Sequence, residues 1–259
     1  MNSLVYFIGA GPGDVELITL KAVRALEKSN VVLYDRLVNP EILDLYTSPF
    51  CKKIFVGKEG YNQNSLKQSE VNEILLDYAL KEPIVSRLKG GDVSIFANIM
   101  DELYTLKKNS IHYEIIPGIT AASGIAAYTG ISLTARKIAR GVRYLTILEN
   151  EFIDDKTWLE YSLTTDTLVF YMSLKSAEKI FYNLKRFGCE KPFAIIQNGT
   201  THQQTTIISN IEEYKSVVLP SNQDGPTLLV IGEVVKMHQE YQWFKSEVNP
   251  CQNFSLELI

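Results

Sequence analysis

Short apolar runs rich in β-branched and aromatic residues alternate with stretches of helical periodicity along the first half of the chain. The runs predict buried strands at residues 4–8, 31–34, 53–56, 84–88 and 113–116. Apolar residues at helical spacing predict helices at 18–27, 68–81 and 99–108, and Thr19 is a candidate cap for the first of them. Strands that alternate with helices predict an α/β fold with a mainly parallel sheet.

The α/β pattern resumes after residue 117 with different spacing. Small residues at 121–128 predict a tightly packed helix, and residues 173–187 predict an amphipathic helix. Strand-like segments follow at 144–148, 167–171, 193–196, 204–208 and 227–232. We therefore expect two α/β domains, at residues 1–117 and 118–240, and a polar tail at 241–259.

Composition and charge exclude several classes of protein. With 46% hydrophobic and 22% charged residues, the chain has the composition of a globular protein rather than a disordered one. The formal net charge of −4 argues against a protein that coats nucleic acid. No apolar run has the length of a membrane helix, and residues 1–8 lack the basic start of a signal peptide, so we expect no membrane partner and a cytoplasmic protein.

The cysteines and histidines are too scattered for a metal site or a disulfide framework. The 3 cysteines and 3 histidines form no Cys-x-x-Cys or Cys/His pair. We therefore expect neither metal nor disulfides, and the candidate chemistry lies elsewhere.

Loops at the predicted carboxyl ends of strands are the candidate ligand sites, because open α/β sheets bind ligands there. The first loop is Gly9-Ala10-Gly11-Pro12-Gly13-Asp14, whose glycines allow close approach of the backbone. Its glycine spacing differs from that of the dinucleotide fingerprint, and Pro12 removes a backbone donor. From this loop alone, a nicotinamide site and an ordinary strand-to-helix turn both stay open.

Other strand ends carry polar or glycine residues that decide nothing singly. Asp35-Arg36 is either a base beside an anion anchor or a surface ion pair. Gly90-Gly91-Asp92 offers bare backbone and a carboxylate, and Thr120 is a candidate helix cap. Met172, taken alone, fits a core position better than a ligand contact.

The order of these motifs resembles the tetrapyrrole methylase superfamily, within it the branch that methylates uroporphyrinogen III. The likeness covers about residues 4 to 236. The glycine motifs are typical of the superfamily, whereas Tyr-Asp-Arg-Leu-Val and Val-Gly-Lys are typical of this branch. The segments that carry the likeness are 5–14, 32–38, 56–58, 87–92, 116–121, 170–172, 198–201 and 225–235.

The resemblance implies two α/β domains with S-adenosylmethionine in the cleft between them, usually in a homodimer. It implies transfer of methyl groups to two pyrrole carbons of uroporphyrinogen III, giving precorrin-2 for siroheme or cobalamin, with S-adenosylhomocysteine as the other product. It assigns Asp35 as base and Lys58 as proton donor or carboxylate anchor. The cofactor contacts that it implies are Pro12, Gly90, Gly91, Asp92, Ile95, Thr120, Ala121, Met172 and Gly199.

A substrate with eight carboxylates needs a local positive surface on a chain whose net charge is −4. Arginine suits bidentate recognition of carboxylates. The candidates are Arg36, Lys58, Lys89, Arg136 and Arg140, with Arg36, Lys89 and Arg136 preferred. For any one of them, a solvated surface charge is the competing interpretation.

Three departures from the family pattern bear on the substrate. The family's Pro-Phe-x-Phe-Gly-Arg-Gly after Gly-Gly-Asp is replaced from Val93 to Asn98, and its Thr-His-Arg is Thr134-Ala135-Arg136. Its Thr-Gly-His after the next strand is also missing, near residues 147–150. The alternatives are a sister methyltransferase acting on a later corrin precursor, a non-catalytic S-adenosylmethionine-binding protein and, last, a nicotinamide oxidoreductase.

Overall fold

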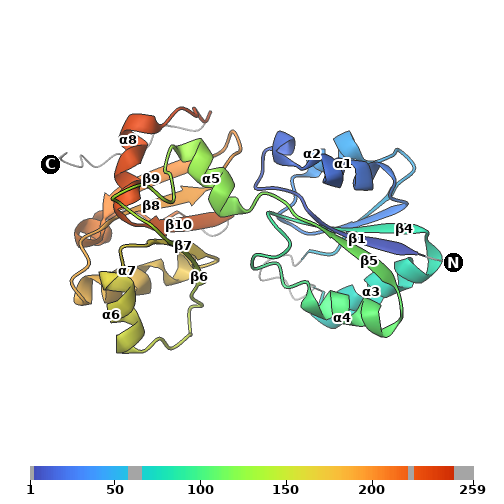
Figure 1. The fold of residues 1–259 in the computed structure, drawn as a ribbon, viewed down its shortest axis with the longest axis horizontal. Helices are drawn as coiled ribbons and strands as arrows, with labels where there is room; N and C mark the ends of the chain where they lie inside the picture. The colour runs from blue at the N-terminus through green and yellow to red at the C-terminus, as the bar shows by residue number, and fades with distance from the viewer. Residues whose placement is uncertain (1–2, 58–65, 221–224, 248–259) are drawn as a thin grey trace. The chain divides into compact units, whose positions relative to one another are not determined.

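The computed structural model describes residues 3–57, 66–220 and 225–247. The chain divides into two compact units, at residues 1–121 and 122–259, each drawn with its own sheet in Figure 1. The division falls just past the boundary expected at residues 117 and 118. Lys58, predicted from the resemblance as a catalytic residue, lies outside the described residues.

A five-stranded parallel sheet forms the first unit, in the order β3-β2-β4-β1-β5. The strands are β1 (Leu4–Gly9), β2 (Val31–Tyr34), β3 (Lys52–Phe55), β4 (Ile84–Lys89) and β5 (His112–Ile116). All five match the predicted strands to within one or two residues. Every neighbouring pair is parallel, so the carboxyl ends of all five strands lie at one edge.

Helices cover both faces of this sheet (Figure 1). They are α1 (Leu20–Glu27), α2 (Pro40–Tyr46), α3 (Gln68–Lys81) and α4 (Met100–Lys108), after a short 3₁₀ turn η1 (Val15–Leu17). Residues of α1 and α2 pack with Val32 and Leu88 on one face, and residues of α3 and α4 with Leu33 and Val85 on the other. Thr19 caps α1 as predicted, since its Oγ1 accepts from the Ala22 N–H at 3.2 Å.

The sheet of the second unit is mixed, in the order β6-β7-β10-β8-β9. Its strands are β6 (Val142–Thr146), β7 (Thr167–Tyr171), β8 (Pro192–Gln197), β9 (Thr205–Asn210) and β10 (Thr227–Ile231). Only β6 and β7 pair in parallel, whereas the other neighbours are antiparallel. The parallel pairing predicted for the first half of the chain does not extend to this unit, where the short loop between β8 and β9 forms a hairpin and β10 pairs antiparallel with both β7 and β8.

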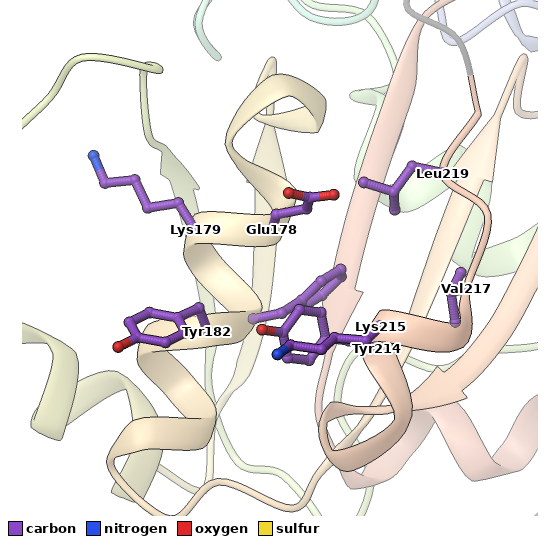
Figure 2. A pocket seen from close by; sticks show the side chains of 8 residues that line it. Glu178, Lys179, Tyr182, Tyr214, Lys215, Val217 and Leu219 are labelled. Carbon is purple, nitrogen blue, oxygen red and sulfur yellow. The ribbon is translucent and has the colours of Figure 1, made fainter.

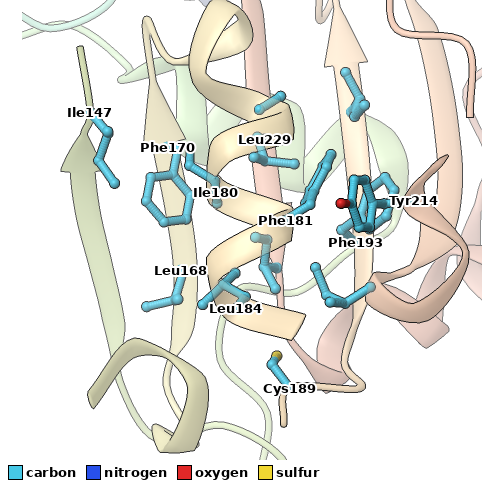
Figure 3. Close-up of a cluster of buried hydrophobic side chains, with 14 of the residues drawn as sticks. Ile147, Leu168, Phe170, Ile180, Phe181, Leu184, Cys189, Phe193, Tyr214 and Leu229 are labelled. Carbon is cyan, nitrogen blue, oxygen red and sulfur yellow. The ribbon is translucent and has the colours of Figure 1, made fainter. Parts of the chain in front are cut away.

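Helices α5 (Ala121–Thr129), α6 (Asp155–Leu163), α7 (Ala177–Arg186) and α8 (His238–Tyr241) accompany this sheet. Short 3₁₀ segments are η2 (Leu174–Ser176), η3 (Ile211–Ser216) and η4 (Glu233–Met237). Figure 3 shows the core between α7 and the strands, where Phe181 stacks on Phe193 with ring centroids 4.2 Å apart. Burial of such aromatic rings is a main source of stability in the unit.

The predicted polar tail begins with packed residues. Trp243 donates its indole N–H to the Ala127 carbonyl at 2.8 Å, and Phe244 packs on the Tyr128 ring with centroids 4.8 Å apart. These aromatic contacts hold the segment after α8 against α5. The last residues, 248–259, lie outside the described part of the chain.

Candidate active site

Loops at the carboxyl ends of β1, β4 and β5 contact one another through their backbones. The Gly91 N–H donates to the Gly11 carbonyl at 2.7 Å, and the Gly11 N–H donates to the Gly91 carbonyl at 3.1 Å. The Ala10 N–H donates to the Lys89 carbonyl at 2.8 Å. These bonds join the loop after β1 to the loop after β4 at the edge where open α/β sheets bind ligands.

Glycine is required where these loops cross. A Cβ on Gly9 would lie 2.6 Å from the Gly118 amide nitrogen, and a Cβ on Gly118 would overlap the Gly91 carbonyl oxygen. Only residues without a side chain let three backbone segments pass this closely. The three loops therefore form one connected surface, called here the glycine platform: residues 9–14, 89–95 and 117–121.

Gly91 presents bare backbone to open space on the glycine platform. Its φ is +68°, and a Cβ placed on it would meet only the Ala121 amide nitrogen, at 3.7 Å. Gly90 differs, because a Cβ there would lie 2.8 Å from the Leu37 Cβ, so its missing side chain serves packing. A ligand can therefore approach the backbone at Gly91 without a side chain in its way.

The Asp92 carboxylate links two loops of the glycine platform through hydrogen bonds. Its Oδ1 accepts from the Ser94 N–H at 2.8 Å and from the Ser94 hydroxyl, while its Oδ2 accepts from the Gly118 N–H at 2.8 Å. The carboxylate is buried. Its hydrogen bonds to Ser94 and Gly118 connect the loop after β4 to the loop after β5. Carboxylate oxygens can accept further bonds, so these contacts leave a role toward a ligand open.

The platform contains every residue of the first unit that was predicted to contact the cofactor. These residues are Pro12, Gly90, Gly91, Asp92, Ile95, Thr120 and Ala121. Sequence order alone separates them widely, and the parallel sheet brings them to one edge. Their contact with a cofactor stays a prediction.

Asp35 lies at the carboxyl end of β2, beside two cations of β4. Its Oδ1 accepts from Arg87 Nη2 at 2.6 Å, and its Oδ2 lies 3.5 Å from Lys89 Nζ. The side chain of Asp35 is 25% exposed, whereas those of Arg87 and Lys89 are buried. Asp35 is thus a partly exposed carboxylate whose orientation is fixed by two buried cations, Arg87 and Lys89.

Lys89 faces into the protein. Its ammonium lies 3.5 Å from Asp35 Oδ2 and 3.5 Å from Glu102 Oε1, and its side chain is only 9% exposed. Two carboxylates of the chain itself therefore already balance its charge. Its predicted role as an anchor for substrate carboxylates stays a prediction, and the exposed side chains of Arg36 and Arg140 are better placed for solvent-borne anions.

Arg87 and Glu102 were not among the predicted site residues, although each leaves a signal in the sequence. Arg87 is a charged residue within the buried central strand β4. Glu102 occupies the apolar face of α4, between Ile99 and Leu106, where the helical spacing calls for a hydrophobic residue. A charge on a buried face of a strand or helix points to a partner inside the fold.

Gly57 lies beside the loop that carries Asp35 and Arg36. A Cβ on Gly57 would stand 2.6 Å from the Arg36 amide nitrogen, so the two backbones are in close contact. The Val56 N–H donates to the Tyr34 carbonyl at 3.0 Å, which continues the pairing of β3 with β2. The end of β3 is thereby fixed next to the Asp35 loop.

In the second unit, the predicted residues Met172 and Gly199 follow the ends of β7 and β8. Met172 has a left-handed backbone, with φ +53°, and is 60% exposed, so it is no core residue. Gly199 packs against the Ile125 side chain of α5, which leaves no room for a Cβ. Arg136 is exposed in the loop between α5 and β6. Their roles toward cofactor and substrate stay predictions.

A hollow on the second unit lies over α7 and η3 (Figure 2). Phe181 and Tyr214 line it together with Glu178, Lys179 and Tyr182 of α7. None of its lining residues belongs to the predicted site. Within residues 3–57, 66–220 and 225–247, we find no group of three or more His, Cys, Asp or Glu side chains suited to a metal. The helices in these ranges are also too short or too polar to cross a bilayer.

Comparison with known proteins identifies close relatives. The chain is 40% identical over 248 residues to a uroporphyrinogen-III C-methyltransferase of Bacillus subtilis, covering 94% of this chain and 95% of that protein. It is 38% identical over 248 residues to the siroheme synthase of Nitrosomonas europaea, covering 95% of this chain but 52% of that protein. The chain thus spans about half the length of the siroheme synthases that it matches.

A solved structure is similar to this chain in both fold and sequence. Uroporphyrin-III C-methyl transferase from Thermus thermophilus, in complex with S-adenyl homocysteine, matches with a TM-score of 0.74 and 31% identity, covering 90% of this chain and 94% of that one. The family model for tetrapyrrole (corrin/porphyrin) methylases matches residues 4–215. The glycine platform, the two α/β units and these similarities agree: the chain belongs to the tetrapyrrole (corrin/porphyrin) methylase family.

Proposed function

We propose that this chain transfers methyl groups from S-adenosylmethionine to two pyrrole carbons of uroporphyrinogen III, giving precorrin-2. The observation that carries the proposal is the 40% identity to the Bacillus subtilis uroporphyrinogen-III C-methyltransferase over nearly the whole of both chains. The siroheme synthases that match over the same residues support the siroheme or cobalamin branch as the destination of the product.

The glycine platform fits a nucleoside cofactor. Gly91 leaves open space beside its backbone, and the Ala121 amide borders that space. Backbone groups at such a place can bond the polar atoms of an adenosine or an amino acid. S-Adenosylmethionine, when bound, supplies a methyl group made electrophilic by a positive sulfur, so the chemistry needs no metal. The chain's own contribution is to bind it and orient the acceptor carbon.

Asp35 takes up the proton that the methylated adduct loses after the methyl group has been transferred. It is exposed enough to meet a substrate, and Arg87 holds it in place through a 2.6 Å bond to Oδ1. A carboxylate in a fixed orientation is a suitable base for one proton transfer. Lys58 is proposed as the proton donor or as a carboxylate anchor, on the basis of the family pattern alone.

Substrate carboxylates are bound by exposed arginines, with Arg36 next to Asp35 as the first choice and Arg136 of the second unit as another. The planar guanidinium pairs with a carboxylate through two parallel hydrogen bonds. Homodimer formation and a cytoplasmic location belong to the same proposal by analogy with the family.

A second candidate acceptor is a later corrin precursor. The observation that favours it is the segment Val93–Asn98, where the family's arginine and glycines are missing and where Phe96 and Asn98 take left-handed backbone with φ +51° and +49°. Such a change alters the surface that an acceptor meets, and leaves the glycines of the platform in place.

An acceptor panel tests the proposal. The purified protein is incubated anaerobically with S-adenosylmethionine and, in turn, uroporphyrinogen III, precorrin-2 or no acceptor, and release of S-adenosylhomocysteine is followed by chromatography. We expect release with uroporphyrinogen III. Release with precorrin-2 alone would favour the sister methyltransferase. Cofactor binding without release from either acceptor would reject methyl transfer to both.

A further inference from the structure

Glu102 is a fully buried carboxylate that the proposed mechanism does not use. Its side chain is 0% exposed, on the face of α4 that packs against the sheet. Oε2 has no hydrogen-bond partner among the described residues. An unsatisfied oxygen of a buried carboxylate is costly, so the position calls for an account beyond packing.

Two cations of β4 join Glu102 to Asp35. Glu102 Oε1 accepts from Arg87 Nε at 3.2 Å and lies 3.5 Å from Lys89 Nζ. The same two side chains reach Asp35, Arg87 through Nη2 and Lys89 through Nζ. Asp35 is the most exposed member of this four-residue charge cluster, and the other three are buried.

Each nitrogen of the Arg87 guanidinium has its own acceptors, and this fixes the orientation of the group. Nε donates to Glu102, while Nη1 donates to the Leu33 and Leu88 carbonyls at 3.5 and 3.3 Å. Nη2 is then the donor aimed at Asp35. Without Glu102, the planar fork could turn to bind Asp35 with two of its nitrogens, and both cations would draw Asp35 inward.

We propose that Glu102 is a positioning residue that acts through Arg87 to hold Asp35 in the geometry for proton removal. The inference deepens the proposed function and rests on it for the role of Asp35. Stability alone is a poor reason to keep such a cluster, since well-packed apolar residues commonly replace buried ion pairs without loss.

The test replaces Glu102 by glutamine, which keeps the shape and removes the charge. We expect kcat to fall about 10- to 100-fold in Glu102→Gln, because a displaced catalytic group costs about that much, while KM for S-adenosylmethionine changes less than about twofold. Asp101→Asn is the matched control: it removes the same charge from the adjacent, exposed residue of α4 and leaves kcat unchanged.

A double-mutant cycle separates positioning from a general structural effect. If Glu102 acts through Asp35, adding Glu102→Gln to Asp35→Asn lowers kcat by less than about twofold more. A double variant whose loss of kcat equals the product of the two single losses would overturn the proposal. If Glu102→Gln does not fold, Arg87→Lys replaces it in the cycle, since lysine keeps the charge but cannot serve both carboxylates.

A spectroscopic readout keeps this test apart from the test of the function. If the wild-type protein shows no turnover of uroporphyrinogen III, the proposed function fails, and the Arg87 Nε–H signal in the nuclear magnetic resonance spectrum still reports the cluster. We expect the chemical shift of this signal to change in both Glu102→Gln and Asp35→Asn and to remain at its wild-type value in Asp101→Asn. A signal unmoved by Asp35→Asn would overturn the coupling.

Discussion

Asp35 is the residue whose replacement tests the proposed chemistry most sharply. Asparagine keeps the size of the side chain and its bond to Arg87 Nη2 but cannot take up a proton at neutral pH. We expect Asp35→Asn to lower kcat about 10²- to 10⁴-fold, the usual contribution of a general base, with cofactor affinity retained. Steady-state kinetics and calorimetry of S-adenosylhomocysteine binding give the two quantities.

The control for Asp35→Asn is Asp44→Asn, which breaks the exposed ion pair between Asp44 and Lys53. Exposed pairs contribute little, so this variant keeps wild-type turnover. Asp35→Asn with unchanged kcat and intact cofactor binding would remove Asp35 from the mechanism.

Gly91 tests where the cofactor lies. Alanine at Gly91 places a methyl group in the open space beside Ala121, and alanine at Gly188 places one where nothing lies within 4 Å. Both residues have positive φ, +68° and +77°, so both variants lose about 1 kcal/mol of stability from backbone strain. We expect only Gly91→Ala to weaken S-adenosylhomocysteine binding, measured by calorimetry. Equal affinity in the two variants would place the cofactor elsewhere.

Single residues also mark the limit of what the sequence could predict. Asp35 and the platform glycines follow apolar strands directly, so their place at the carboxyl edge could be deduced from the pattern. The ion pairs of Glu102 and the inward direction of Lys89 could not be deduced, because both depend on how α4 packs on β4 in three dimensions. Charged residues are rarely buried, and a sequence gives no register between a helix and the sheet beneath it.

Among the elements, the loops after β4 and β5 depend on one carboxylate. Asp92→Ala leaves the Ser94 and Gly118 amides without their acceptor, and each of these part-buried hydrogen bonds contributes about 1 kcal/mol to stability. We expect Asp92→Ala to lower the denaturant midpoint and to weaken cofactor binding, because the loops that form the platform separate. Asp166→Ala, which breaks an ion pair to Arg143 in the second unit, serves as the comparison and keeps cofactor affinity. Unchanged affinity in Asp92→Ala would show that the platform does not need this tie.

The two sheets differ in how far the elements could be predicted. In the first unit, each strand is followed by a helix, and this alternation implies parallel pairing, as found. In the second, the strand segments were found but not their order, because β10 inserts between β7 and β8. Such a pairing between segments distant in sequence leaves no local signal. The short helices α2, α6 and α8 were also not predicted.

On the scale of the whole molecule, stability depends on pH through His238. Its ring Nδ1–H donates to the Thr129 carbonyl at 2.6 Å, and burial lowers its pKa below the ordinary value of 6.5. Below about pH 6.5, His238 therefore binds a proton in the unfolded chain but stays neutral in the folded chain. The free energy of unfolding falls as the pH decreases further. The loss is at most about 1.4 kcal/mol per pH unit.

Chemical denaturation at about pH 7.5 and about pH 5.5 measures this term. We expect His238→Asn to be less stable than the wild type at the higher pH, because it loses packing, and to lose less stability on acidification. The same acid loss in both proteins would assign the effect to other groups.

The product itself decides the central claim. Uroporphyrinogen III is incubated anaerobically with the wild-type protein and S-adenosylmethionine carrying a labelled methyl group, and the mass of the isolated tetrapyrrole is measured. The account predicts two labelled methyl groups on each macrocycle. An unchanged tetrapyrrole, from protein that binds S-adenosylhomocysteine, would contradict it.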